Sequence, residues 1–156
     1  MTNNDILRRL RYTFDLKDSY VKDVFTAADA EVTRDQIIAW MKKEEDEDYV
    51  AMVDKELATF LNGFINVRRG KREGEQPVPE KRLNNNLIFM KLRIALNLKA
   101  EDIIDIMQLA EFNMSKHELS AFFRKPDNKH YRDCKDQILR NFIMGLQLKY
   151  RPKADV

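Results

Sequence analysis

The sequence predicts an all-α protein built from two homologous four-helix repeats that are related by pseudo-twofold symmetry. Three observations lead to this fold class. Apolar residues recur at helical spacing along the chain, and 156 residues contain only four Gly and four Pro. Helix-capping motifs precede several of the amphipathic segments. The chain also aligns with itself without a gap at a shift of 82 residues, so the pattern of the first half returns in the second.

The internal repeat is visible as matched residue pairs along its whole length. The capping motif Thr33-x-x-Gln36 falls on Ser115-x-x-Glu118, which indicates that the same helix begins at the same place in each copy. Other matched pairs are Asn3 and Asn85, Asn4 and Asn86, Trp40 and Phe122, Asp54 and Asp136, and Gly63 and Gly145. The register never breaks, so we interpret the chain as an internal duplication.

The stretch from residue 98 to 125, LKAEDIIDIMQLAEFNMSKHELSAFFRK, is the most informative part of the second copy. It reads as two short amphipathic helices joined by a tight turn, with Ser115 capping the second helix. Leu119 and Phe122 give that second helix an apolar face. Because Phe122 is equivalent to Trp40, we expect both side chains to be fully buried in the core of their repeat.

These motifs also carry a family resemblance. The signature AEDIIDIMQLA…SKHELSAFFRK, the repeated opening NN-x-I-x-x-x-LR and the duplicated architecture are similar to those of the bacterial YehS-like family, small proteins of unknown function. The resemblance covers nearly the whole chain. It implies a helical protein of the bacterial cytoplasm, and it supplies neither a reaction nor catalytic residues.

The pattern divides the chain into residues 1–67 as repeat 1, 68–84 as a charged Pro/Gly linker, 85–150 as repeat 2 and 151–156 as a frayed tail. In repeat 1, Asn3-Asn4 and Thr33 are expected to cap the first and third helices, and the fourth helix is expected over 48–67. In repeat 2, helices are expected at 87–97, 100–112, 116–124 and 129–149. The paired Gly63 and Gly145 indicate either a close backbone approach or a helix C-cap.

Composition excludes several classes of protein. There is no apolar run near the roughly 18 residues that a membrane helix needs, and the N-terminal stretch lacks a signal-peptide core. The single cysteine, Cys134, cannot form an internal disulfide and suits a reducing compartment. We therefore expect a cytoplasmic protein with no membrane partner.

The net charge of +2 is distributed unevenly. Residues 1–66 carry 9 Lys and Arg against 14 Asp and Glu, residues 67–83 carry 6 against 3, and residues 84–156 carry 13 against 9. In the simpler interpretation, two halves of opposite sign attract and pack together. In the other interpretation, the linker and repeat 2 face a polyanion.

The central helix pair of each repeat is helix-turn-helix-like, which raises the question of nucleic-acid binding. In repeat 2 the turn residue Asn113 tolerates positive φ, whereas Glu31 in repeat 1 is a poor choice, and Leu109 is bulky for the closest crossing. The candidate nucleic-acid surface combines basic linker residues with the outward face of the helix expected at 116–124. Its residues are Arg68, Arg69, Lys71, Arg72, Lys116, His117, Ser120, Arg124 and Lys125.

Catalytic and metal-binding motifs do not emerge from the sequence. It has two His, one Cys, no Gly-rich phosphate loop, no Ser-His-Asp arrangement and no HExxH motif. The acidic run from Glu44 to Asp48 lacks the alternating ligands and glycine turn of a calcium loop. The sequence therefore predicts a small binding module that is not an enzyme and needs no cofactor or metal. Nucleic acid is the first candidate partner; the alternative is a protein-interaction or homo-oligomeric scaffold that binds no nucleic acid.

Overall fold

The computed structural model describes residues 1–151, and every regular element in that range is a helix. The tail that the sequence predicts to fray lies outside the described residues, apart from Arg151. Repeat 1 contains α1 (Asn3–Phe14), α2 (Asp18–Ala27), α3 (Arg34–Met41) and α4 (Asp54–Arg69). Repeat 2 contains α5 (Asn85–Ala95), α6 (Ala100–Leu109), α7 (Lys116–Ala121) and α8 (Asp136–Tyr150).

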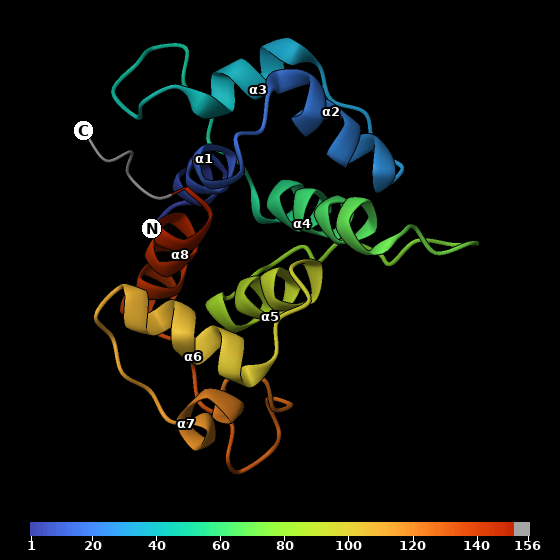
Figure 1. Ribbon diagram of the computed structural model, residues 1–156. Coiled ribbons are helices and arrows are strands. Elements are labelled where there is room, and N and C mark those ends of the chain that lie inside the picture. Colours follow the sequence, from blue (N-terminus) through green and yellow to red (C-terminus); the bar gives the residue numbers. More distant parts are fainter. Residues whose placement is uncertain (152–156) are drawn as a thin grey trace.

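The two repeats pack against each other through their first and last helices. The first helix of each repeat packs against the last helix of the other, so that α1 lies on α8 and α4 lies on α5 (Figure 1). The α2–α3 pair and the α6–α7 pair cover opposite ends of this central group (Figure 1). Because both cross-repeat contacts join equivalent helices, the all-α duplicated fold with pseudo-twofold symmetry is confirmed.

Helix capping follows the prediction at the third helices and differs at the first. Thr33 with Gln36 and Ser115 with Glu118 both form reciprocal capping boxes. Helix α1 is capped by Thr2, one residue before the predicted Asn3-Asn4 pair, and α5 is capped by Asn84 and begins two residues before its predicted start at residue 87. The predicted capping role of Asn3-Asn4 is therefore wrong, and these side chains have another function described below.

The last helix of each repeat begins later than the sequence suggests, at Asp54 and at Asp136. Residues 42–53 and 122–135 form loops instead, and α7 ends at Ala121 rather than at 124. The physical reason is that buried asparagine side chains from α1 and α5 bond to the backbone of these loops, which removes the need for helical bonds there. Val53, which lies within the segment predicted as the fourth helix, is 57% exposed as a result.

The paired glycines mark the closest crossing in each repeat, where α2 meets α4 and α6 meets α8. A Cβ atom on Gly63 would lie 1.9 Å from the Val24 carbonyl oxygen, and one on Gly145 would lie 2.2 Å from the Ile106 carbonyl oxygen. Val24 and Ile106 are themselves equivalent positions. Since both helices continue past their glycine, the close-approach interpretation is confirmed and the C-cap interpretation is wrong.

The aromatic pair in the third helices is less equivalent than predicted. Trp40 is only 1% exposed and stacks on Phe25 with ring centroids 5.6 Å apart. Phe122 is half-buried, because α7 stops one residue before it whereas α3 continues past Trp40. The prediction of full burial is correct for Trp40 and wrong for Phe122.

We expect Gly63→Ala to destabilise the protein by at least about 3 kcal/mol, because the added methyl group collides with backbone that cannot move without separating α2 from α4. Gly70→Ala is the matched control. Gly70 has a φ of +97° and open space around it, so its cost is limited to about 1–2 kcal/mol of backbone strain. Urea denaturation measures both; equal losses would contradict the close crossing.

Truncating the two third-helix aromatics should cost different amounts of stability. Trp40→Ala removes a fully buried side chain and should lower the free energy of unfolding by about 3–5 kcal/mol. Phe122→Ala removes a half-buried ring and should cost about 1–2 kcal/mol. If Phe122→Ala lost as much free energy of unfolding as Trp40→Ala, the prediction would be wrong, because the Phe122 ring would then contribute as much as a fully buried side chain.

Candidate anion-binding site

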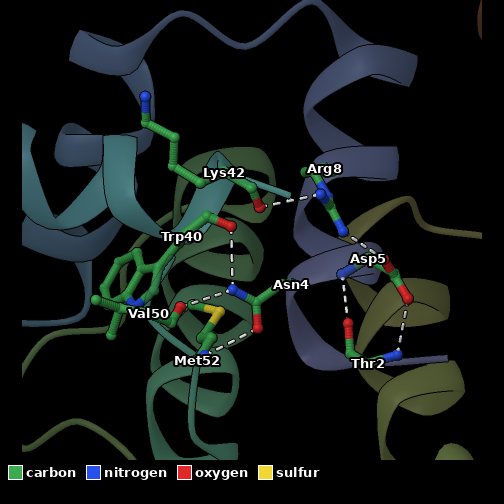
Figure 2. Close-up of polar contacts among 8 residues, drawn as sticks. All are labelled: Thr2, Asn4, Asp5, Arg8, Trp40, Lys42, Val50 and Met52. Carbon is green, nitrogen blue, oxygen red and sulfur yellow. Dashed lines mark hydrogen bonds and ion pairs between the residues drawn. The ribbon is translucent and has the colours of Figure 1, made fainter. Parts of the chain in front are cut away.

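A buried asparagine holds the loop before the last helix in repeat 1. Asn4, 1% exposed, donates from Nδ2 to the carbonyl oxygens of Trp40 at 3.0 Å and Val50 at 2.9 Å (Figure 2). Its Oδ1 accepts a hydrogen bond of 2.9 Å from the backbone N–H of Met52 (Figure 2). One amide therefore fixes the end of α3 and two points of the following loop.

Repeat 2 contains the same arrangement at a shift of 82 residues. Asn86 Nδ2 donates to the carbonyl oxygens of Phe122 at 3.0 Å and Arg132 at 2.8 Å, and the Cys134 N–H donates to its Oδ1 at 2.9 Å. The backbone N–H of Arg132 also donates to the Ala121 carbonyl at 3.1 Å. The loop is therefore attached to the end of α7 at fixed positions.

The preceding asparagines add a second attachment. Asn3 Nδ2 donates to the Met52 carbonyl at 3.0 Å and to Asp54 at 2.8 Å. Asn85 does the same with the Cys134 carbonyl at 2.9 Å and Asp136 at 2.7 Å, and this hydrogen bond lowers the pKa of the Asp136 carboxyl. The role of the two Asn-Asn pairs could have been inferred from the sequence. Thr2 and Asn84, which precede the pairs, can cap the helices, so the paired asparagines are not needed for capping.

The loop and α7 enclose a pocket of about 340 Å³ on the surface of repeat 2. Side chains with cationic or hydrogen-bonding groups dominate its lining: His117, Ser120, Arg124, His130 and Arg132, together with Glu118, Ala121 and Phe122. Among these lining residues the one carboxylate is engaged in capping α7. The hydrogen bonds from Ser115 also lower the pKa of the Glu118 carboxyl, which keeps the carboxylate ionised and held at the N-terminus of α7.

The two repeats differ in chemistry at this place although they share its scaffold. At the positions equivalent to His117 and His130, repeat 1 has Asp35 and Asp48. At the positions equivalent to Ser120 and Arg132 it has Ile38 and Val50, and only Arg124 has a basic counterpart, Lys42. Since Asn4 holds the repeat 1 loop equally well, folding does not require the cationic lining of the pocket in repeat 2.

The predicted site residues fall into two groups that the structure does not bring together. His117, Ser120 and Arg124 line the pocket. Lys116 forms an ion pair with Glu101 on α6, and Lys125 is exposed beyond the end of α7.

The basic residues predicted in the linker lie against repeat 1. Arg68 and Arg69 form the last turn of α4, and the Arg68 guanidinium lies 5.6 Å from the ring centroid of Phe14. Lys71 forms an ion pair of 2.5 Å with Asp29, and Arg72 is exposed. This end of α4 lies well away from α7 (Figure 1).

Two pocket residues, His130 and Arg132, were not predicted from the sequence. They lie in a segment predicted as helix, and only the loop brings them to α7. One sequence feature could have identified them: the equivalent positions in repeat 1 carry residues of different chemistry, Asp48 and Val50.

The turn between the paired helices also differs from the prediction. Positive φ occurs at Asp29 and Glu111, not at Glu31 and Asn113. Helix α7, the second member of this helix pair in repeat 2, has six residues and is therefore about 9 Å long, which offers little surface for reading base edges.

The described range, residues 1–151, contains no group of three or more His, Cys, Asp or Glu side chains placed to hold a metal ion. Over the same range no helix is long and apolar enough to span a bilayer. Cys134 is 4% exposed, and burial raises the pKa of its thiol to about 12.

Cys134 offers a direct test of the asparagine attachment, because it is the single cysteine of the chain. At pH 8 only about one thiol in ten thousand is ionised when the pKa is about 12, so the folded protein should react very slowly with a disulfide reagent. Asn86→Ala releases the Cys134 N–H and two carbonyls, and should accelerate the reaction at least tenfold.

The matched control is Asn4→Ala, which removes the same three hydrogen bonds in repeat 1. We expect each variant to lose about 1–3 kcal/mol of stability from groups left unpaired. Only Asn86→Ala should accelerate modification beyond what this loss explains. Equal acceleration in both variants would show that global unfolding, rather than the loop, exposes the thiol.

Comparison with known proteins matches this duplicated geometry. A family model described as "Protein of unknown function (DUF1456)" matches the chain twice, over residues 3–70 and 85–151. The chain is 40% identical over 154 residues to the uncharacterized protein YehS of Escherichia coli (strain K12), covering 98% of this chain and 99% of that relative. No solved structure matches. The two matched segments correspond to the two repeats, which confirms the duplication and the family resemblance.

Proposed function

The chain belongs to this family of proteins of unknown function, and we propose that it is a non-enzymatic binding module whose second repeat binds the phosphate backbone of a nucleic acid. The observation that carries the proposal is the pocket formed by α7 and the loop attached to Asn86. It gathers two arginines, two histidines and a serine hydroxyl around one concave surface. These are the groups that hydrogen-bond phosphate oxygens.

The comparison between the repeats supports a role in binding rather than in folding. Repeat 1 folds around the same attachment with Asp35, Asp48 and Val50 at the equivalent positions. A cationic cluster that the fold does not require raises local repulsion without a structural benefit. A polyanion would offset that repulsion.

The dimensions of the site favour contact with phosphates over the reading of bases. Helices α6 and α7 pack against each other, as the proposed helix-turn-helix-like pair would. However, α7 is short, and both arginines of the pocket lie in the segment after it rather than on the helix. We therefore propose binding with little sequence preference, centred on Arg124 and Arg132. Lys125 extends the same surface beyond the pocket.

Arg69 and Arg72, two exposed basic residues predicted as part of the nucleic-acid surface, lie at the end of α4 and just after it. Within the proposal they contribute to the long-range attraction of a polyanion, since they do not line the pocket. Arg68 and Lys71 are engaged with Phe14 and Asp29 and contribute less.

The test is fluorescence anisotropy with random-sequence DNA and RNA at several salt concentrations. Arg124→Glu with Lys125→Glu should weaken binding at least tenfold, because two cations are replaced by anions at a phosphate-binding surface. In the unmodified protein the affinity should fall with salt with a log–log slope of about −0.9 for each duplex phosphate contacted.

The equivalent pair in repeat 1 provides the control. Lys42→Glu with Lys43→Glu changes the net charge by the same amount and should leave binding close to that of the unmodified protein, because the loop of repeat 1 carries Asp48 and Val50 where the pocket in repeat 2 has His130 and Arg132. An equal loss of nucleic-acid affinity in both double variants would show that binding depends on the net charge of the protein and not on the pocket. No binding at low salt, combined with a stable oligomer in sedimentation, would refute the proposal and support the scaffold alternative.

A further inference from the structure

The linker between the repeats occupies a groove of its own. Its residues Gln76, Pro77 and Glu80 line the groove between α4 and α5 together with Ile65, Leu87, Met90 and Ile94. Two polar contacts hold it there. The Asn66 amide donates to Gln76 Oε1 at 2.8 Å, and the Lys91 ammonium lies 3.0 Å from the Glu80 carboxylate. The α4–α5 groove therefore shows how this scaffold holds an extended segment that carries a carboxylate.

Pseudo-symmetry places an equivalent groove on the other side of the molecule, between α1 and α8. This α1–α8 groove encloses about 450 Å³. Five of its lining residues, Asp5, Arg8, Arg9, Tyr12 and Gln147, are equivalent to Leu87, Met90, Lys91, Ile94 and Ile65 of the α4–α5 groove. It is completed by Met1 and Arg140.

The key difference between the two grooves concerns Arg9 and its counterpart Lys91. Lys91 is satisfied by Glu80 and by Asn62 Oδ1, which accepts its hydrogen bond at 2.6 Å. In the α1–α8 groove the position of Asn62 is taken by Met144. The single linker runs along the other groove, where it lines a pocket of about 310 Å³, so it supplies no carboxylate here.

Arg9 therefore has no equivalent of either partner of Lys91, the Glu80 carboxylate or the Asn62 side chain. Over residues 1–151, Arg9 and Arg140 form no ion pair and no side-chain hydrogen bond, although Arg9 is half-buried. Arg8 is committed to Asp5 at 2.5 Å and to the Lys42 carbonyl at 3.1 Å (Figure 2). A half-buried guanidinium without a partner loses hydration without gaining a counter-charge.

We propose that the α1–α8 groove docks an extended acidic segment of a partner protein, in the position equivalent to that of the linker in the α4–α5 groove. Carboxylates of the segment bind Arg9 and Arg140, since guanidinium groups match carboxylate geometry with two parallel hydrogen bonds. Replacement of the apolar Met90 and Ile94 by Arg8 and Tyr12 makes this groove more polar than its counterpart. It therefore suits a more acidic segment than the linker.

The experiment uses the linker itself as a probe in trans. A fluorescent peptide with the sequence of residues 73–80, EGEQPVPE, carries three glutamates and two prolines. It should bind the full-length protein saturably below about 1 mM. Binding should weaken at least tenfold with Arg9→Gln plus Arg140→Gln, and also when the three glutamates of the peptide are changed to glutamine. Unchanged thermal unfolding midpoints establish that the variant protein is folded.

Arg124→Gln is the matched control, because it removes an exposed arginine from the pocket on repeat 2 and should leave peptide binding unchanged. In return, Arg9→Gln should leave nucleic-acid binding unchanged. Lack of saturable peptide binding, or binding that is insensitive to Arg9 and Arg140 because the peptide displaces the linker, would overturn the proposal. So would a loss of nucleic-acid affinity in Arg9→Gln, which would assign the groove to the nucleic-acid surface.

Discussion

The loops of this fold depend on one buried amide in each repeat. Asn4 and Asn86 each make three hydrogen bonds with backbone groups that lie 36 to 48 residues away in the sequence. A buried donor or acceptor left without a partner costs about 1–3 kcal/mol, so each amide prevents several such penalties at once. It also allows the chain to leave helical geometry after the third helix, and the resulting loop supplies half of the candidate site.

Duplication separates what the fold requires from what it merely tolerates. Both copies keep the buried asparagines and the glycine at the closest helix crossing. They differ where the loop meets the third helix, since His130 and Arg132 replace Asp48 and Val50. The shared residues bond or contact the backbone of another element, whereas the differing residues face solvent. That contrast is the physical basis for assigning binding chemistry to repeat 2.

Much of the fold was predictable from the sequence, because local patterns encode it. Helical periodicity, the capping boxes at Thr33 and Ser115, and the ungapped repeat required no knowledge of distant contacts. The loops were mispredicted because Asn86 reaches them from a position far away in the sequence, and no local pattern reveals such a bond. The same limit applies to the site. His117, Ser120 and Arg124 share one segment predicted as helix and were selected as candidates, whereas His130 and Arg132 join them in the pocket only through the loop.

A duplicated chain joined by one linker cannot remain symmetric. Two equivalent grooves form where the first helix of one repeat meets the last helix of the other, yet the linker runs from α4 to α5 and lines only the groove beside it. Lys91 therefore has a linker carboxylate as its partner, whereas its equivalent Arg9 does not. The α1–α8 groove lacks the linker, and its arginines and tyrosine give it a chemistry that the linker never contacts. The asymmetry of the surface thus follows from the connectivity of a symmetric fold.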